Sequence, residues 1–325
     1  MQRRRLGNTD LDLTVIGLGT WAIGGSWQFG WGDQNDDDST AAINEAMDCG
    51  INWIDTAPIY GCGDSETRVG KALKGMSAKP LVATKCSLLW NDKREKYSCL
   101  EPASIIKECE DSLRRLAVEV IDLYQMHWPM PDEQIEAGWE AMAALQKQGK
   151  VRYIGTSNFI MSQLERVSAI CRVSSLQPPY NMVCRDIEDE LLPYCKANDI
   201  GVICYSPMQK GLLSGAFNKE RMERLACDDV RHRDKDFNGQ RFEINLELVE
   251  QLKEIARQSG MTVAQLAISW VLKADGVTAA IVGARKKGQI AETVKAADVK
   301  LTNDSIEEIE ELLAQRNAKI SDFCP

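Results

Sequence analysis

Short runs of β-branched and other apolar residues alternate along this chain with longer stretches that have helical periodicity. This alternation predicts parallel strands joined by helices, because two parallel strands can be connected only through a long crossover. Eight such runs occur, and no change in composition divides them into separate groups. We therefore predict an α/β fold, a single (β/α)8 TIM barrel. The predicted strands are residues 13–19, 51–55, 81–85, 120–127, 151–156, 174–177, 201–205 and 279–283.

The stretches between these runs are the predicted helices, and the length of the chain agrees with one barrel. A chain of 325 residues lies within the range in which α/β barrels form one domain. We expect residues 1–325 to form that domain, with an N-terminal hairpin over 1–14 and a C-terminal tail over 316–325. Ser39 is the expected N-cap of the first helix. The predicted helices are 40–49, 66–73, 104–116, 135–148, 162–170, 186–197, 246–258, 263–273, 288–296 and 305–314.

The interval between the seventh and eighth predicted strands is much longer than the others and contains a segment rich in Gly, Asp and Arg. This segment, residues 206–242, follows a barrel strand, and loops in that position lie at the C-terminal face, where barrel enzymes have their active sites. Long loops of this kind in compact domains are often functional. We interpret residues 206–242 as a flap over a cofactor and substrate site, and the alternative is a loosely packed surface insertion.

A glycine motif after the first strand suggests a different fold, but its context argues against that fold. Gly17, Gly19 and Ala22 fit the G-x-G-x-x-[GA] pattern of dinucleotide-binding sheets. In those sheets a helix begins inside the motif, whereas residues 21–27 here are rich in Gly and Trp and have no helical periodicity. We therefore interpret the glycines as allowing a close turn at the mouth of the barrel.

Composition excludes several classes of protein. The chain has 39 Lys and Arg against 48 Asp and Glu, a net charge of -9, which argues against binding to nucleic acid or to an anionic membrane. No apolar stretch is long enough for a membrane-spanning helix, and the basic N-terminus lacks the apolar core of a signal peptide. The 11 Cys are odd in number and include no C-x-x-C pair, which indicates reduced thiols in the cytoplasm. We expect no metal site, because no cluster has metal-ligand spacing, and a monomer or weak homo-oligomer.

Four polar residues lie at or just beyond the ends of consecutive predicted strands. Asp55 ends the second strand and Tyr60 lies in the loop after it, while Lys85 ends the third strand and His127 the fourth. Because neighbouring parallel strands of a barrel end on the same face, these four side chains should lie together. A structural ion pair or a buried core histidine would explain single members of the set, but not all four at once.

The chemistry of these four side chains suits donation of a proton to the carbonyl group of a substrate. A phenol has a pKa of about 10, and an adjacent ammonium favours its ionised form, so Lys85 should lower the pKa of Tyr60 and make it a usable acid or base. Asp55 would hold Lys85 charged and oriented. A neutral His127 would donate a hydrogen bond to the carbonyl oxygen of a substrate. Since no side chain carries a hydride, reduction of that carbonyl requires a nicotinamide cofactor.

Further motifs occur in the order found in one enzyme family. They are Gly-Leu-Gly-Thr-Trp at 17–21, Asp-Thr-Ala-x-x-Tyr-Gly at 55–61, His-Trp-Pro at 127–129, Gly-x-Ser-Asn-Phe at 155–159, Gln-Pro-Pro-Tyr-Asn at 177–181, Tyr-Ser-Pro at 205–207 and Gly-Ala-Arg at 283–285. With Lys85 after its strand, these motifs resemble the aldo-keto reductases over residues 5–300, and especially the bacterial reductases of the general-stress and inositol-operon type.

The resemblance implies a barrel that binds NADP(H) in an extended form across its C-terminal face, with Asp55, Tyr60, Lys85 and His127 as a catalytic tetrad. It implies that Tyr205 stacks on the nicotinamide, and that three polar residues at strand ends hold the carboxamide. Those three are Ser157, Asn158 and Gln177. The remaining cofactor residues that it implies are Thr20, Trp21, Asp55, Ser206, Pro207, Lys210, Gly211, Leu212, Gly283, Arg285, Gln289 and Glu292.

A basic turn follows the eighth predicted strand. Arg285, Lys286 and Lys287 precede a predicted helix, where each cation opposes the helix dipole by about a few tenths of a kcal/mol. An anion bound at the helix N-terminus would account for this arrangement, and a solvated basic turn is the alternative. Together with the resemblance, the turn favours the 2′-phosphate of NADP(H) as that anion, so we expect NADPH to be preferred over NADH. Thr293 departs from the Asn that many members of the family have after the residue equivalent to Glu292.

Tryptophan is concentrated in the predicted loops at the barrel mouth. Trp21, Trp27, Trp31, Trp90 and Trp128 lie there, among eight Trp in all. Aromatic residues gathered on one face form an apolar wall with polar edges, which suits a sugar or a hydrophobic carbonyl compound. We therefore expect a small carbonyl compound or polyol as the partner of this protein. The residues expected to contact it are Trp21, Tyr60, His127 and Trp128.

The preferred interpretation is an NADP(H)-dependent oxidoreductase that reduces aldehydes or ketones, including aldoses, to alcohols by hydride transfer, with Tyr60 as general acid. One alternative is a Schiff-base aldolase with Lys85 as the nucleophile, although a pair with Asp55 would keep that lysine protonated. Another alternative is a cofactor-sensing binding subunit of the same fold, which the intact set of four polar residues argues against.

Overall fold

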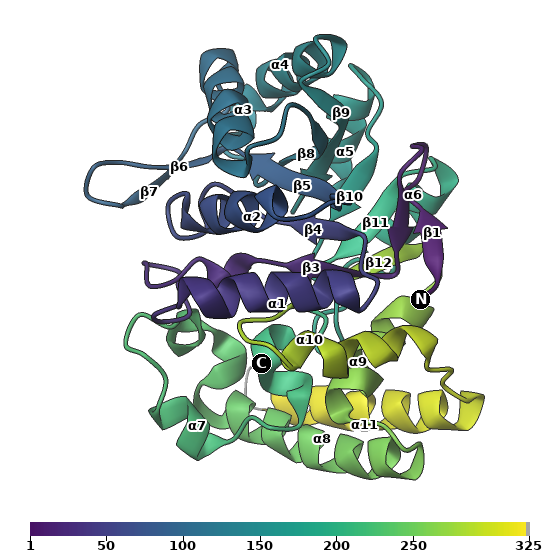
Figure 1. Cartoon of the computed structure of the whole chain (residues 1–325). Coiled ribbons are helices and arrows are strands. Elements are labelled where there is room, and N and C mark those ends of the chain that lie inside the picture. The colour runs from purple at the N-terminus through teal and green to yellow at the C-terminus, as the bar shows by residue number, and fades with distance from the viewer. Residues whose placement is uncertain (323–325) are drawn as a thin grey trace.

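The computed structural model describes residues 1–322, and a closed barrel of parallel strands lies at its centre (Figure 1). The strands follow one another round the barrel in sequence order, and β12 pairs with β3 to close it. The prediction of a (β/α)8 barrel is confirmed, and each predicted strand overlaps one barrel strand. The barrel strands are β3 (Ile16–Gly19), β4 (Trp53–Asp55), β5 (Leu81–Cys86), β8 (Ile121–Met126), β9 (Val151–Ser157), β10 (Ser175–Gln177), β11 (Gly201–Cys204) and β12 (Val277–Gly283).

The helices that pack round the barrel also follow the predicted pattern. Their buried faces form one large hydrophobic cluster with the outward-facing residues of the strands, as expected for parallel strands covered by amphipathic helices. Every predicted helix overlaps one of them. They are α1 (Asp36–Asp48), α2 (Asp64–Lys74), α3 (Pro102–Leu116), α4 (Ile135–Lys147), α5 (Met161–Ser168), α6 (Leu191–Ala197), α8 (Gly239–Gln258), α9 (Val263–Lys273), α10 (Gln289–Thr293) and α11 (Asn303–Ser321).

Helix α1 begins earlier than predicted, because Asn35 and not Ser39 is its N-cap. The side chain of Asn35 accepts hydrogen bonds from the backbone N–H groups of Asp37 and Asp38. Asp36 joins these two residues in the first turn, where negative charge interacts favourably with the helix dipole. The prediction of Ser39 as the cap was wrong because Asn35 offers the same capping chemistry four residues earlier.

Helices α8 and α11 extend furthest beyond their predicted bounds. Helix α8 begins at Gly239, inside the segment interpreted as a flap. Helix α11 continues to Ser321, so much of the segment 316–325 is helical where a tail was predicted. Residues 323–325 of that segment lie outside the described part of the chain. Among the helices of residues 1–322, none is both long and apolar enough to cross a membrane.

One end of the barrel is closed by an antiparallel hairpin of β1 (Arg3–Arg5) and β2 (Asp12–Thr14). The side chain of Asn52, just before β4, accepts a hydrogen bond from the backbone N–H of Thr14, so the hairpin lies at the N-terminal ends of the strands. Its leucines fill the bottom of the barrel interior. The buried cluster that they form consists of Leu6, Leu11, Leu13, Trp53, Ala83, Leu123, Ile203, Ala279 and Ile281.

The opposite end of the barrel carries the long loops. A second hairpin of β6 (Leu88–Trp90) and β7 (Lys96–Ser98) projects after β5, and the segment between β11 and α8 contains the short helix α7 (Lys219–Glu223). In Figure 1 these two features stand at the left of the view and the N-terminal hairpin at the right. The carboxyl ends of the barrel strands therefore face the long loops, which is the end where barrel active sites occur.

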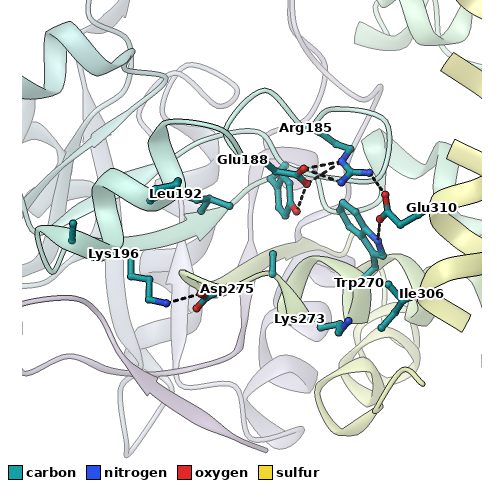
Figure 2. Close-up of a pocket in the computed structure, with 13 residues that line it drawn as sticks. Arg185, Glu188, Leu192, Lys196, Trp270, Lys273, Asp275, Ile306 and Glu310 are labelled. Carbon is teal, nitrogen blue, oxygen red and sulfur yellow. Dashed lines mark hydrogen bonds and ion pairs between the residues drawn. The ribbon is translucent and has the colours of Figure 1, made fainter. Parts of the chain in front are cut away.

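A separate groove of about 850 Å³ lies on the outer wall of the barrel, between α6, α9 and α11 (Figure 2). The guanidinium of Arg185 lies 5.2 Å from the centre of the Trp270 ring and bonds to Glu188 and Glu310. The indole N–H of Trp270 donates to Glu310 at 3.2 Å, which ties α11 to α9. This groove lies among helices and away from the carboxyl ends of the strands.

Candidate active site

A cavity of about 610 Å³ opens at the carboxyl ends of the barrel strands. Most of the residues expected at the site line this cavity, since they lie at or beyond the carboxyl ends of the strands of one barrel. Lys85 does not line it, because its side chain is fully buried beneath Tyr60. The expected residues that line the cavity are Thr20, Trp21, Asp55, Tyr60, His127, Trp128, Ser157, Asn158, Gln177, Tyr205, Ser206, Pro207, Lys210, Gly211, Gly283, Arg285, Gln289 and Glu292.

Leu212 is the expected cofactor residue whose side chain lies elsewhere. It is fully buried and packs with Phe217, Phe237 and Phe242 inside the segment between β11 and α8. The reason is the left-handed backbone at Lys210 and at Gly211, which turns the following side chain away from the cavity. The side chain of Leu212 therefore stabilises the loop that covers the cavity instead of lining it.

Lys85 is held by three oxygen atoms, which matches the three N–H bonds of an ammonium group. Its Nζ donates to Asp55 Oδ1 at 2.6 Å, to the carbonyl oxygen of Thr56 at 2.8 Å and to the phenol oxygen of Tyr60 at 3.3 Å. β4 and β5 are adjacent in the barrel, and their ends bring Asp55 and Lys85 together as expected. The geometry fixes the lysine and points one of its N–H bonds at the phenol.

His127 completes the set from the end of β8. Its ring centre lies 5.8 Å from that of Tyr60, at an interplanar angle of 85°. Burial lowers the pKa of His127 well below its usual value, and the positive charges of Lys85 and Lys96 act in the same direction. The imidazole is therefore neutral at pH 7 and can donate one hydrogen bond toward the cavity.

The pKa of Tyr60 differs from our expectation. Burial raises the pKa of the phenol well above its usual value, and the negative charge of Asp55 adds to this effect. Burial also lowers the pKa of Lys85, against the opposing influence of Asp55. The expectation that Lys85 brings the pKa of Tyr60 down was wrong, because desolvation of the phenol is the largest influence on that pKa and raises it. Tyr60 consequently keeps its proton through the neutral range and is a donor.

Gln125 is a polar residue of the site that our sequence analysis missed. It is fully buried on β8, and its Nε2 lies 3.3 Å from Asp55 Oδ2. Gln177 Nε2 donates to the same Asp55 oxygen at 2.8 Å and to Gln125 Oε1 at 3.1 Å. Because residues two apart on a strand face the same side, the position of Gln125 two residues before His127 was the available signal.

Replacing Gln125 with Leu is expected to lower kcat by about tenfold, because Asp55 would lose a hydrogen bond to a charged group inside the barrel. Cofactor affinity should change little. Steady-state kinetics and fluorescence titration of the cofactor check this, and Gln148→Leu on the surface after α4 is the matched control. An unchanged kcat, or a kcat loss matched by the control, would show that Gln125 does not position Asp55.

Three residues at the ends of β9 and β11 form a second hydrogen-bonded group. Asn158 Nδ2 donates to the carbonyl oxygen of His127 at 2.9 Å, and its Oδ1 accepts from the hydroxyl of Tyr205 at 2.8 Å. Ser157 Oγ donates to the carbonyl oxygen of Gln177 at 2.8 Å. With both N–H bonds of Gln177 used by Asp55 and Gln125, its Oε1 is left as an acceptor, which fits the amino group of a nicotinamide carboxamide.

Arg285 holds the loop after β3. Its guanidinium donates to the carbonyl oxygens of Trp31 and Asp33 at 2.6 Å each and to Gln34 Oε1 at 2.9 Å. The Gln289 side chain accepts hydrogen bonds from the backbone N–H groups of Arg285 and Lys286. The side-chain bonds of Arg285 and a longer one to Gly32 use four of the five N–H bonds of the guanidinium, so one N–H of Nη1 is left for an acceptor such as a phosphate.

The segment 206–242 is folded against the same loop. The backbone N–H of Trp27 donates to Asp228 Oδ2 at 3.1 Å, and that of Val230 donates to the carbonyl oxygen of Gly30 at 3.2 Å. Lys210 pairs with Asp234 at 2.6 Å within the segment. These contacts, with the buried phenylalanine cluster round Leu212, make the segment an ordered cover for the cavity and argue against a loosely packed insertion.

The aromatic wall is present, with one difference from the sequence-based expectation. Trp21, Trp27, Trp31 and Trp128 line the cavity, and the Trp21 ring stacks near Tyr60 with a centre-to-centre distance of 6.3 Å. Trp90 lies outside it, because its ring packs against the guanidinium of Arg115 at 6.0 Å. Phe29, Ile59 and Leu88 extend the wall, so the part of the cavity beside Tyr60 and His127 is mostly apolar.

The barrel, the four polar residues and the residue motifs define the class of protein. Residues 15–314 match the Aldo/keto reductase family, and the chain belongs to that family.

The chain is similar over most of its length to individual members. It is 40% identical over 293 residues to aldo-keto reductase YhdN of Bacillus subtilis (strain 168), covering 89% of this chain and 87% of that protein. It is 34% identical over 318 residues to the NADH-specific methylglyoxal reductase of Escherichia coli (strain K12), covering 93% of this chain and 95% of that protein. Among solved structures, the glycerol dehydrogenase AKR11B4 from Gluconobacter oxydans matches with a TM-score of 0.88 and 37% identity, covering 97% of this chain and 96% of that chain.

Proposed function

We propose that the protein is a nicotinamide-dependent reductase of small aldehydes and ketones in which Tyr60 is the proton donor. The observation that carries this proposal is the position of the Tyr60 phenol, which lines the cavity beside His127 and contacts Lys85 Nζ at 3.3 Å. A bound nicotinamide supplies or removes the hydride. Its carboxamide would meet Gln177 Oε1, and its ring would lie against Tyr205.

In this mechanism, His127 donates a hydrogen bond to the carbonyl oxygen and fixes its direction. The proton of Tyr60 passes to that oxygen as the carbonyl carbon is reduced, which leaves a phenolate 3.3 Å from Lys85 Nζ. The ammonium then stabilises the phenolate, and Asp55 holds the ammonium in place at 2.6 Å. The reverse sequence oxidises an alcohol, with the phenolate as base.

Aldehydes, ketones, aldoses and the corresponding polyols are the proposed substrates. The aromatic wall beside Tyr60 supports this choice, and so does similarity to two relatives named as a methylglyoxal reductase and a glycerol dehydrogenase. A panel of such compounds, followed by nicotinamide absorbance in both directions, tests it. Turnover of at least one carbonyl compound is expected, and an inactive panel with intact protein would refute the proposal.

Burial and pairing of Lys85 speak against the aldolase alternative. The lysine is fully buried, does not line the cavity, and has its three N–H bonds directed at protein oxygens. A Schiff base would require its nitrogen to reach a substrate carbonyl as a free amine.

The binding-subunit alternative predicts cofactor binding without turnover, which the same panel distinguishes. We also propose a cytoplasmic setting, because the ten described cysteines are unpaired thiols.

We propose NADPH as the preferred cofactor, and expect its kcat/KM to exceed that of NADH. The support is the charge of the turn Arg285–Lys287, where Lys286 and Lys287 form no ion pair among residues 1–322. Arg285→Ala should lower kcat/KM for NADPH by about tenfold, since a charged contact to phosphate is lost, and that for NADH less. Kinetics with both cofactors measure this.

The control for this prediction is Gln34→Ala. It removes one acceptor of the Arg285 guanidinium and loosens the loop after β3, but it leaves the positive charge. The ratio of NADPH to NADH efficiency should therefore stay unchanged in the control. Equal efficiency of the two cofactors in the unmodified protein would contradict the proposal, and the NADH-specific relative makes this comparison necessary.

A further inference from the structure

Lys96 differs from the other cationic residues that line the active-site cavity. Lys210 pairs with Asp234, Arg231 pairs with Asp229, and Arg285 is bound to backbone carbonyls. Arg221 donates to the carbonyl oxygen of Ala216 within the segment between β11 and α8. Lys96 has neither a carboxylate nor a carbonyl partner among residues 1–322. The cationic side chains lining the cavity in this part of the chain are Lys96, Lys210, Arg221, Arg231 and Arg285.

The hairpin that carries Lys96 is attached to the site by hydrogen bonds. The indole N–H of Trp27 donates to the carbonyl oxygen of Arg94 at 2.9 Å, and the Arg94 guanidinium donates to the carbonyl oxygen of Gly61 at 3.0 Å. Lys96 pairs with Trp90 in the β6–β7 register. Glu95, the neighbouring carboxylate, accepts a hydrogen bond from Asn91. The backbone of Lys96 is therefore fixed beside the loop of Tyr60, and its ammonium is left without an anion.

The side chain of Lys96 is exposed to solvent where it lines the cavity, and it lies over an aromatic ring. Its Nζ lies 5.4 Å from the centre of the Phe29 ring, a cation–π contact that holds the charge over the aromatic wall. Its charge is close enough to His127 to contribute to the lowered pKa of the imidazole. Among the described residues, the carboxylates that line the cavity are Asp55, which is bound to Lys85, and Glu292, on α10.

We propose that Lys96 binds an anionic substituent of the substrate, so that the preferred substrates are carbonyl compounds bearing a carboxylate or a phosphate. A carbonyl between Tyr60 and His127 would place the rest of a short molecule along the aromatic wall toward the ammonium. The protein as a whole carries a net charge of -9, which repels anions, and a local unpaired cation offsets this at the mouth of the site. This inference rests on the proposed carbonyl reduction and adds its substrate class.

Three matched pairs of substrates test the proposal, each with an anionic and a neutral member. They are 4-carboxybenzaldehyde and methyl 4-formylbenzoate, succinic semialdehyde and butanal, and glyceraldehyde 3-phosphate and glyceraldehyde. Turnover is measured with saturating cofactor for the unmodified protein, Lys96→Met and Lys93→Met. Lys93 is exposed on the tip of the same hairpin and does not line the cavity, so its variant controls for a general loss of positive charge.

The unmodified protein should favour the anionic member of at least one pair. Lys96→Met should lower kcat/KM for that member by about tenfold or more, mainly through KM, while the neutral member changes by less than about twofold. Lys93→Met should change neither, and added salt should weaken the preference in the unmodified protein. The first two pairs report on a carboxylate and the third on a phosphate, so the pair that responds identifies the anion.

Two results would overturn the inference and are distinct from failure of the proposed function. No preference for an anionic member in any pair, with neutral aldehydes still reduced, would remove the substrate class and leave carbonyl reduction intact. An equal loss for both members in Lys96→Met would give the lysine a structural role. If none of the six compounds is reduced, the proposed function is refuted, and this inference with it.

Discussion

Replacing Tyr60 with Phe is expected to abolish carbonyl reduction while cofactor affinity stays nearly unchanged. The substitution removes one hydroxyl group. Among the described residues, this hydroxyl is the only acidic group that lines the cavity and lies between Lys85 and His127. General acid catalysis contributes about 10²- to 10⁴-fold to such reactions, so kcat should fall by at least that factor. Fluorescence titration of the cofactor and single-turnover reduction measure the two quantities separately.

Tyr205→Phe is the matched control. It also removes a phenol oxygen from the cavity, but that oxygen donates to Asn158 and does not contact Lys85. Its kcat should therefore remain within about tenfold of the unmodified enzyme, since one neutral hydrogen bond is lost. Turnover retained in Tyr60→Phe, or lost to the same degree in both variants, would contradict the assignment of Tyr60 as the acid.

The pH dependence of reduction supplies a further test of the same residue. Burial raises the pKa of Tyr60 and lowers that of His127, so both groups keep one protonation state across the neutral range. The rate of reduction should therefore be level near pH 7 and decline only at alkaline pH, where Tyr60 loses its proton. A decline on passing from pH 6 to pH 8 would show that another group controls the proton.

The sequence was sufficient to predict what depends on strand order. Parallel strands of a barrel end on one face, so residues at the ends of runs were correctly expected to meet, as Asp55, Lys85 and His127 do. Parallel strands are buried on both faces and are therefore apolar runs. Such runs can be recognised in the sequence without knowing which elements pack beside them. Helix starts depend on which of several capping residues is used, and for that reason Ser39 was chosen where Asn35 is the cap.

The partners of polar side chains were less predictable, because they depend on loops whose paths the sequence does not encode locally. Arg285 was expected at a phosphate, and in the structure it binds carbonyl groups of a loop more than two hundred residues earlier. In the sequence, Gln125 is a polar residue within a predicted strand. Only the structure shows that Gln177 and Asp55 lie beside it. Lys96 lies in a charged hairpin, and only the structure shows that it faces the cavity.

The buried pair of Lys85 and Asp55 is expected to be the most costly place in the barrel to remove a single charge. Lys85→Met leaves Asp55, which is 3% exposed, without its counter-ion. Breaking a buried pair in this way typically destabilises a protein by about 3–5 kcal/mol, because the remaining charge is unpaired and desolvated. Urea unfolding followed by circular dichroism should show this loss, together with the absence of turnover.

Two companion variants separate the stability of this pair from its function. Lys150→Met removes a lysine from the exposed pair with Glu110 and should cost less than about 1 kcal/mol, because water already screens that pair. Asp55→Asn combined with Lys85→Met removes both buried charges but keeps an amide oxygen that Gln125 and Gln177 can bond. This double variant should recover most of the lost stability and none of the activity. A Lys85→Met variant as stable as Lys150→Met would contradict the predicted cost. Recovered stability without turnover in the double variant would show that a neutral interior of similar shape folds as well. The two buried charges would then serve proton transfer at Tyr60.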